Sequence, residues 1–140
     1  MIIIDNIRNL SNNSGYENII IVRSLKHAVS GASHQPILSP SVSLLCDYQK
    51  WAKQGNWNAE KFASDYVPRF IREIKHNPDA IALLDELYKC SKSDDIALYC
   101  FCPDEALCHR SIVAGMLLGA GANISCSEDY KKYWQIFREA

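Results

Sequence analysis

The sequence predicts an α/β fold: a single compact domain with a small, mostly parallel sheet flanked by helices in a Rossmann-like three-layer arrangement. Short β-branched runs at residues 2–4 and 18–22 have the continuous apolar character of strands buried on both faces. A strand, a helix and a strand follow one another over residues 96–126, as in a parallel crossover. The 140 residues, 48% of them hydrophobic, suffice for one core, so residues 1–140 are expected to form one domain.

The first quarter of the chain contains two strands and little periodic structure. The run at residues 2–4 predicts a short buried strand, and the run at residues 18–22 predicts a second strand that ends at Arg23. Asn and Ser are frequent in residues 9–18, which predicts a loop. Residues 24–38 show no periodicity and predict a long irregular segment, a kind of loop that often covers a binding site.

Three helices are expected in the middle of the chain. Ser39 followed by proline predicts the N-cap and first position of a helix that ends at Gly55. A second helix is expected to begin at Asn58 and to kink or restart at Pro68, which cannot donate a backbone hydrogen bond. Asn77, followed by proline and aspartate, predicts the cap of a third helix with an apolar face.

The last third of the chain predicts the crossover unit. Residues 95–101 are continuously apolar, as in a central parallel strand, and residues 102–108 are expected to form a loop. A helix over residues 111–118 is expected to end at the two glycines that follow. Residues 123–126 predict a short final strand, and Ser127 caps a last helix. The expected order is therefore β-β-α-α-α-β-α-β-α.

Composition excludes several classes of protein. The net charge is −1, and no polybasic tract is present. Because phosphate neutralisation supplies most non-specific affinity for nucleic acids, broad nucleic-acid binding is not expected, although a local positive pocket is compatible with this charge. No apolar run approaches the roughly 18 residues of a membrane span, and the N-terminal run has no basic leader. We therefore expect a cytoplasmic protein without a membrane partner.

The chain contains six cysteines, which are expected to stay reduced in that compartment. Cys46 and Cys90 are interpreted as buried core residues. Three of the other four, Cys100, Cys102 and Cys108, lie in one short segment and are of greater chemical interest. The last, Cys126, lies further along the chain.

The segment from Cys100 to Ser111 leaves the carboxyl end of a predicted buried strand and enters the N-terminus of a helix. Ligands bind at this place in open α/β sheets, because free backbone N–H groups and the positive end of the helix dipole face the crevice. Arg110 and Ser111 are therefore predicted to bind an anion, with His109 as a donor or proton carrier.

A thiol nucleophile is predicted in the same segment. Cys108 lies where a helix N-terminus, His109 and Arg110 are all expected to favour the thiolate, and Cys100 or Cys102 is a second candidate. The phosphatase loop, in which arginine follows cysteine after five residues, is excluded because that spacing from Cys102 reaches Cys108.

Metal binding is the main alternative for these residues. Cys100, Cys102, Cys108 and His109 have the ligand types of a zinc quartet, with Cys126 as a substitute. The spacing argues against it, because one residue separates the first two cysteines and the adjacent Cys108 and His109 are expected to point apart. We therefore predict neither a metal nor a cofactor. Simple core packing of the thiols is a further alternative.

The same segment resembles the signature of domain-of-unknown-function family 488, in which a strand ending in cysteine precedes a Cys-His-Arg-Ser run that opens a helix. Residues 96–100 and 108–111 match it. Residues 38–41 are similar to the family's Leu-Ala-Pro-Ser helix start, and Trp57 with the aromatic residues after it is similar to its Trp-x4-Phe-x3-Tyr helix. The resemblance covers about residues 36–126 and implies an α/β fold without a settled activity. Cys102 departs from the usual pattern.

Two residues outside the segment are candidate ligand-binding residues. Arg23 follows a predicted strand, with an ordinary surface arginine as the alternative, and Tyr66 has a hydroxyl that can face the site, with core packing as the alternative. Together these residues predict that a phosphate- or nucleotide-type anionic small molecule binds at the strand-to-helix switch point. Thiol catalysis by Cys108, His109 and Cys100 is left open. The alternative is a zinc-stabilised, non-catalytic module that associates with nucleic acid or protein.

Overall fold

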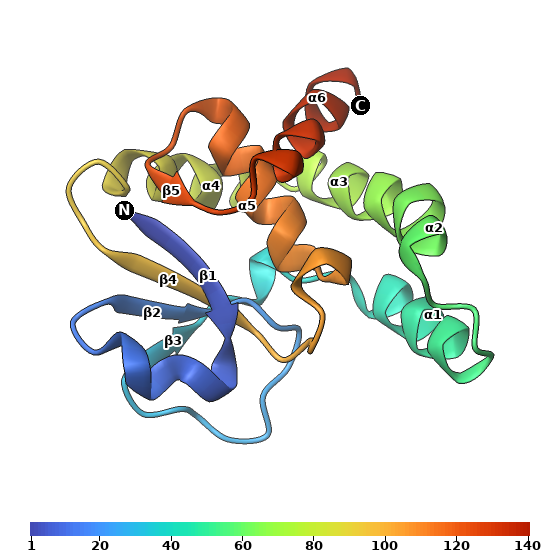
Figure 1. The fold of residues 1–140 in the computed structure, drawn as a ribbon, viewed down its shortest axis with the longest axis horizontal. Helices are drawn as coiled ribbons and strands as arrows, with labels where there is room; N and C mark the ends of the chain where they lie inside the picture. The colour runs from blue at the N-terminus through green and yellow to red at the C-terminus, as the bar shows by residue number, and fades with distance from the viewer.

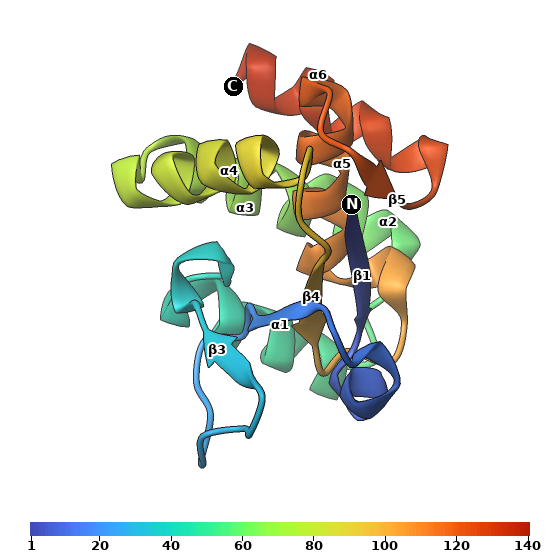
Figure 2. The same ribbon diagram turned by 90° about the vertical axis from the view of Figure 1, so that its left-hand side faces the viewer.

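A computed structural model describes residues 1–140 and contains one five-stranded sheet in which all pairs are parallel (Figure 1). The strand order is β3-β2-β4-β1-β5. The strands are β1 Ile2–Asn6, β2 Glu17–Ile20, β3 Ala32–His34, β4 Ile96–Cys100 and β5 Ile124–Ser125. Figure 2 shows β3 at one edge of the sheet. The predicted α/β class with a parallel sheet is confirmed, although the strand order differs from the 3-2-1-4-5-6 order of the doubly wound dinucleotide-binding fold.

Helical segments cover both faces of the sheet. The α-helices are α1 Val42–Lys53, α2 Ala59–Lys61, α3 Val67–Lys75, α4 Pro78–Cys90, α5 His109–Ala120 and α6 Lys132–Glu139. The tighter turns are η1 Ile7–Asn13, η2 Pro36–Leu38, η4 Glu105–Leu107 and η5 Glu128–Lys131, and the wider π-helical segment is η3 Phe62–Tyr66. Contacts place α5 against β1, β4 and β5, and η1 against β1, β2 and β4. None of the helices has the length and apolar character needed to cross a bilayer.

The central strand β4 is buried along its whole length and divides the core into two parts. Leu98 belongs to the larger cluster, with Phe70 and Ile112 from the helices. Tyr99 belongs to the smaller cluster, with Ile20, on the side of η1. Burial of each large side chain stabilises the fold by roughly 1.5–3 kcal/mol, so alternation along β4 fixes its register between β1 and β2.

The strand order creates a crevice at the carboxyl ends of β2 and β4. After β2 the chain runs to β3, at one edge of the sheet. After β4 it runs through α5 to β5, at the opposite edge. Because neighbouring strands whose connections diverge leave their carboxyl ends uncovered, this pair forms the switch point at which ligands bind in open α/β sheets. The predicted placement of the cysteine segment at a strand-to-helix connection is confirmed.

Several elements differ from the sequence-based expectation. The segment 24–38, expected to be irregular, contains β3 and η2, and the expected loop at 9–18 overlaps the 3-10 helix η1. β3 has only three residues, too few to show the alternation of apolar and polar side chains that predicts a strand. It forms a strand because it pairs with β2.

Helix boundaries also shift, and contacts explain the shifts. The N-cap of α1 is Ser41 rather than Ser39, because the Glu73 carboxylate accepts hydrogen bonds from the backbone N–H (2.9 Å) and hydroxyl (2.5 Å) of Ser41. Helix α5 begins at His109 and continues past the expected end to Gly121, which has φ 97° and terminates it. The structure resolves the expected kink at Pro68 as a π turn, in which the N–H of Val67 bonds to the carbonyl five residues earlier.

The carboxylate of Asp5, at the end of β1, organises a polar network beneath η1. It accepts hydrogen bonds from the backbone N–H of Asn6 (2.7 Å) and the side chains of Asn9 (2.8 Å) and Asn13 (3.2 Å). The Asn13 amide also donates to the hydroxyl of the buried Tyr99 at 2.9 Å. Burial acts to raise the pKa of Asp5, but these hydrogen bonds outweigh it and lower the pKa below its usual value.

The Asp5→Asn variant is expected to be less stable at pH 7 by about 1 kcal/mol, a value that allows for solvent screening at this half-buried group. A lowered folded pKa gives stability that is present above the unfolded pKa and lost as the pH falls through the folded pKa. The difference from the unaltered protein should therefore shrink toward pH 3. Urea denaturation at both pH values measures it, with the exposed Asp94→Asn as control. An equal difference at both pH values would contradict the role of the carboxylate charge.

Candidate functional site

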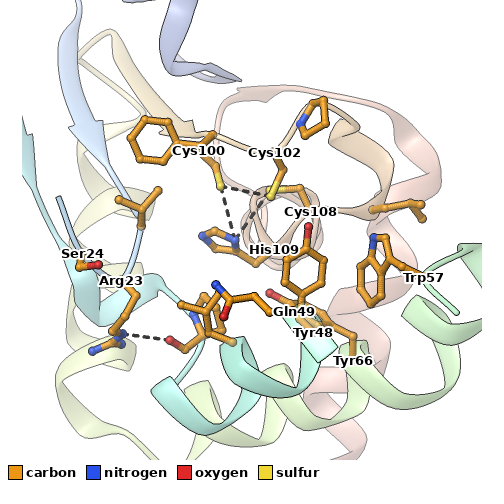
Figure 3. Close-up of a pocket in the computed structure, with 16 residues that line it drawn as sticks. Arg23, Ser24, Tyr48, Gln49, Trp57, Tyr66, Cys100, Cys102, Cys108 and His109 are labelled. Carbon is orange, nitrogen blue, oxygen red and sulfur yellow. Dashed lines mark hydrogen bonds between the residues drawn. The ribbon is translucent and has the colours of Figure 1, made fainter. Parts of the chain in front are cut away.

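A cavity of about 350 Å³ lies at the crevice between the ends of β2 and β4 (Figure 3). Its polar wall comes from residues that follow these two strands and from the N-terminus of α5. Its aromatic wall comes from α1, the turn after α1 and η3, which contribute Tyr48, Trp57 and Tyr66. A cavity of this volume can enclose a small organic molecule with an apolar or planar part.

Three thiols gather at this wall. The Sγ atoms of Cys100, Cys102 and Cys108 lie within 4.8 Å of one another, and the first two are 3.6 Å apart. Cys100 ends β4, and Cys102 follows at a spacing of two, which returns its side chain to the same side of an extended chain. Cys108 joins them as the residue that precedes α5. Three sulfur atoms at this separation could also hold one soft metal ion.

The imidazole of His109 faces the thiols with one nitrogen and the backbone with the other. Its Nε2 lies 2.6 Å from the carbonyl oxygen of Ile21. A carbonyl oxygen only accepts, so this hydrogen bond assigns the proton of the neutral ring to Nε2. The unprotonated Nδ1 then faces the Sγ atoms of Cys108 and Cys100 at 3.7 and 3.8 Å (Figure 3).

The expectation that Cys108 and His109 point apart is wrong. Cys108 is the N-cap of α5 and has extended backbone angles of φ −123° and ψ 147°, whereas His109 is the first helical residue. The change from extended to helical backbone turns two adjacent side chains to the same side. The main geometric objection to a shared site for these residues is therefore removed.

The three thiols differ in acidity. Hydrogen bonding with Cys102 and with Cys108 lowers the pKa of Cys100 and outweighs burial, which acts to raise it; the nearby His109 acts in the same direction as the two thiols. The hydrogen bond to Cys100 raises the pKa of Cys102 to about 12, and burial raises the pKa of Cys108 well above its usual value. The direction for Cys108 is opposite to the one expected from the helix N-terminus, because desolvation of this buried sulfur outweighs the dipole. The thiolate of the cluster is best stabilised on Cys100.

Arg110 and Ser111 are buried behind the thiols and do not line the cavity. The Arg110 Nη1 donates to the carbonyl oxygen of Cys102 at 3.0 Å and to the Sγ of Cys108 at 3.7 Å. The Ser111 hydroxyl donates to the Cys108 carbonyl at 2.8 Å. The structure therefore places these two predicted anion ligands where they fix the backbone around the thiols.

Arg23 and Tyr66 do line the cavity. The Arg23 guanidinium donates to the carbonyl oxygens of Pro40 (3.0 Å) and Pro36 (2.9 Å) and forms no ion pair. Neutral carbonyls thus hold the cation in place without cancelling its charge. Tyr66 is buried in an aromatic cluster, in which its ring stacks on that of Phe70 at 6.1 Å, and burial raises its pKa.

Sequence reasoning missed two aromatic residues of the wall, Tyr48 and Trp57, whose rings meet edge to face at 4.6 Å. Their helical and capping positions are those of core residues, so no local signal separates a cavity wall from a core. Sequence reasoning also placed Cys46 and Cys90 in the core. Cys46 is exposed on α1, and Cys90 is only half-buried at the end of α4, where it packs against the edge of the larger core cluster.

Comparison with known proteins now adds a family to this geometry. A family model described as DUF488-N3a, the active DUF488-N3 subclade, matches residues 2–121. The chain belongs to the DUF488 family. This match includes the strands β1, β2 and β3, which the resemblance over residues 36–126 left out, and every residue of the DUF488 site described above. No curated protein and no solved structure matches the chain.

Proposed function

We propose that this DUF488 protein binds a small anionic molecule in the cavity and acts on it through the thiol of Cys100. The observation that carries this proposal is the position of His109, whose protonated Nε2 bonds to Ile21 and whose Nδ1 faces the thiol. A nucleophile, a base within reach and a third group that orients the base are the parts of an activated nucleophile.

The anionic character of the ligand follows from the charges at the cavity. Arg23 supplies a cation that carbonyls orient and that no carboxylate neutralises. The N-terminus of α5 lies at the same wall, and its dipole favours negative charge. The aromatic side chains opposite, Tyr48, Trp57 and Tyr66, suit a planar part of the ligand such as a heterocyclic ring.

The chemistry of the proposal is a nucleophilic substitution. The thiol proton of Cys100 passes to Nδ1 of His109, and a sulfur lone pair forms a bond to an electrophilic carbon of the ligand. The leaving group departs with the electron pair of the bond that breaks. The resulting imidazolium keeps the hydrogen bond from its Nε2–H to the carbonyl of Ile21. It can then pass the proton that Nδ1 took from Cys100 to the leaving group.

Two alkylating agents of nearly equal shape test the proposal. Iodoacetate carries a charge and iodoacetamide does not, and both transfer a carbon to sulfur with loss of iodide. We expect the iodoacetate-to-iodoacetamide rate ratio of Cys100 to be about tenfold higher than that of free cysteine, because one close cation is worth about 1.4 kcal/mol. Mass spectrometry of peptides after short exposures, with the protein fully reduced, gives the rate at each cysteine.

The Arg23→Gln variant should lose this preference and keep its reaction with iodoacetamide, whereas Arg8→Gln at an exposed position should change neither rate. A Cys100 that reacts no faster than the exposed Cys46 would exclude the thiol chemistry. An unchanged ratio in Arg23→Gln would exclude the anion site.

A further inference from the structure

We propose that Cys100, Cys102, Cys108 and Nδ1 of His109 form a binding site for one thiophilic metal ion of the Zn²⁺ class. This inference goes beyond the proposed substitution chemistry, because a bound metal uses the same sulfur and nitrogen lone pairs. The metal-bound form would therefore be unable to carry out nucleophilic attack, and metal binding would switch the thiol chemistry off.

The separations of the donor atoms fit one ion. With Zn–S bonds of about 2.3 Å and Zn–N bonds of about 2.0 Å, tetrahedral coordination places sulfur atoms about 3.8 Å apart and sulfur and nitrogen about 3.5 Å apart. The Sγ atoms of Cys100 and Cys102 are 3.6 Å apart, and Nδ1 of His109 lies 3.8 Å from Cys100 and 3.7 Å from Cys108. The three Sγ atoms all lie within 4.8 Å of one another, whereas the His109 nitrogen is not this close to every sulfur, so side-chain rotations that bring Nδ1 and the Cys102 sulfur together would complete the four-donor set.

The imidazole is already in the tautomer that a metal requires. Metal-binding histidines usually donate the N–H of the second nitrogen to a carbonyl or carboxylate, which fixes the ring and frees the first nitrogen. The bond from Nε2 of His109 to the carbonyl of Ile21, at 2.6 Å, is such a contact. This hydrogen bond also ties His109 to the residue after β2, so a metal would join β4 to α5 at a point already fixed to β2.

The charge around the cluster also favours an ion. Three thiolates and one divalent cation carry a net charge of −1. The buried Arg110 guanidinium, 3.7 Å from the Sγ of Cys108, supplies the compensating positive charge. Arg110 and Asn6 hold the carbonyl of Cys102 at 3.0 and 3.1 Å, and so fix the backbone of the ligand that lies outside any regular element. Burial of three thiolates costs free energy unless cations of this kind lie beside them.

Cobalt(II) gives a direct test with the reduced full-length protein. We expect one Co²⁺ per chain, with the visible absorption of tetrahedral coordination and an ultraviolet sulfur-to-metal charge-transfer band, both displaced by one equivalent of Zn²⁺. The Cys102→Ser variant should bind at least about tenfold more weakly, whereas Cys46→Ser, at an exposed thiol on α1, should bind as tightly as the unaltered protein. Absence of the charge-transfer band, or equal affinity of Cys102→Ser, would overturn the proposal.

A second measurement needs no variant and separates this inference from the proposed function. Iodoacetamide labelling of Cys100 is followed with and without stoichiometric Zn²⁺, and labelling of Cys46 is the internal control. Slower labelling of Cys100 with one equivalent of Zn²⁺, at an unchanged rate for Cys46, supports the metal site, and labelling unaffected by Zn²⁺ overturns it. Slow labelling of Cys100 without metal, together with binding of Co²⁺, would remove the nucleophile and leave the metal site standing.

Discussion

Cys100 of the His109→Gln variant is expected to react with iodoacetamide about 10²-fold more slowly at neutral pH than Cys100 of the unaltered protein. In the unaltered protein Nδ1 of His109 lies 3.8 Å from the sulfur and can accept its proton. A glutamine amide can still donate to the Ile21 carbonyl, so the backbone contact is kept. It offers no basic nitrogen to the thiol, and a proton acceptor of this kind contributes typically 10²–10⁴-fold.

His34→Gln is the matched control for this experiment. The Nε2 of His34 also lies beside a backbone carbonyl, that of Val22, at 2.7 Å, and His34 is not among the residues that line the cavity. We expect its Cys100 to react at the unaltered rate. Thermal denaturation of both variants separates a lost base from a lost fold. Equal rates in His109→Gln and the unaltered protein would show that the thiol ionises without the imidazole.

The Gly115→Ala variant is expected to lose about 3 kcal/mol of unfolding free energy, because it overpacks the junction of α5 with the C-terminal segment. A Cβ atom at position 115 would lie 1.9 Å from the backbone oxygen of Tyr130 and 2.9 Å from Cδ2 of Tyr133. The backbone of η5 would have to move away from α5. This loss is a net value: the overpacking also offsets the roughly 1 kcal/mol by which alanine is favoured over glycine in a helix.

Chemical denaturation measures this loss, and a fall in the melting temperature of roughly 10 °C should accompany it. Glu86→Ala, a substitution at an exposed position of α4, should change the stability by less than about 0.5 kcal/mol. A Gly115→Ala protein as stable as the unaltered one would mean that α5 and η5 do not approach closely at this position.

The larger elements of the fold follow from local patterns. The apolar run that became β4 is long enough and continuous enough to predict a central strand, and Asn77 followed by proline predicts the start of α4 correctly. Elements with no pattern of their own were not predictable. β3 has three residues and depends on pairing with β2, and the start of α1 depends on the carboxylate of Glu73, which is distant in sequence.

The site divides in the same way. The spacing of Cys100, Cys108 and His109 around a strand-to-helix connection predicts that they lie at the switch point. The roles of Arg23 and Arg110 could not be predicted from the sequence, because they depend on the direction in which each side chain points. Arg110 turns toward the Cys102 carbonyl, behind the thiols, and Arg23 turns along the wall of the cavity.

The sequence by itself determined the α/β class, the family and the short segment in which the reactive residues lie, because periodicity and motif spacing are local properties of the chain. The tertiary structure alone decided which atoms meet. It turned His109 toward the thiols and placed the aromatic residues of α1 and η3 opposite them. These outcomes depend on backbone angles at the cap of α5 and on contacts between segments far apart in sequence, which no local pattern encodes.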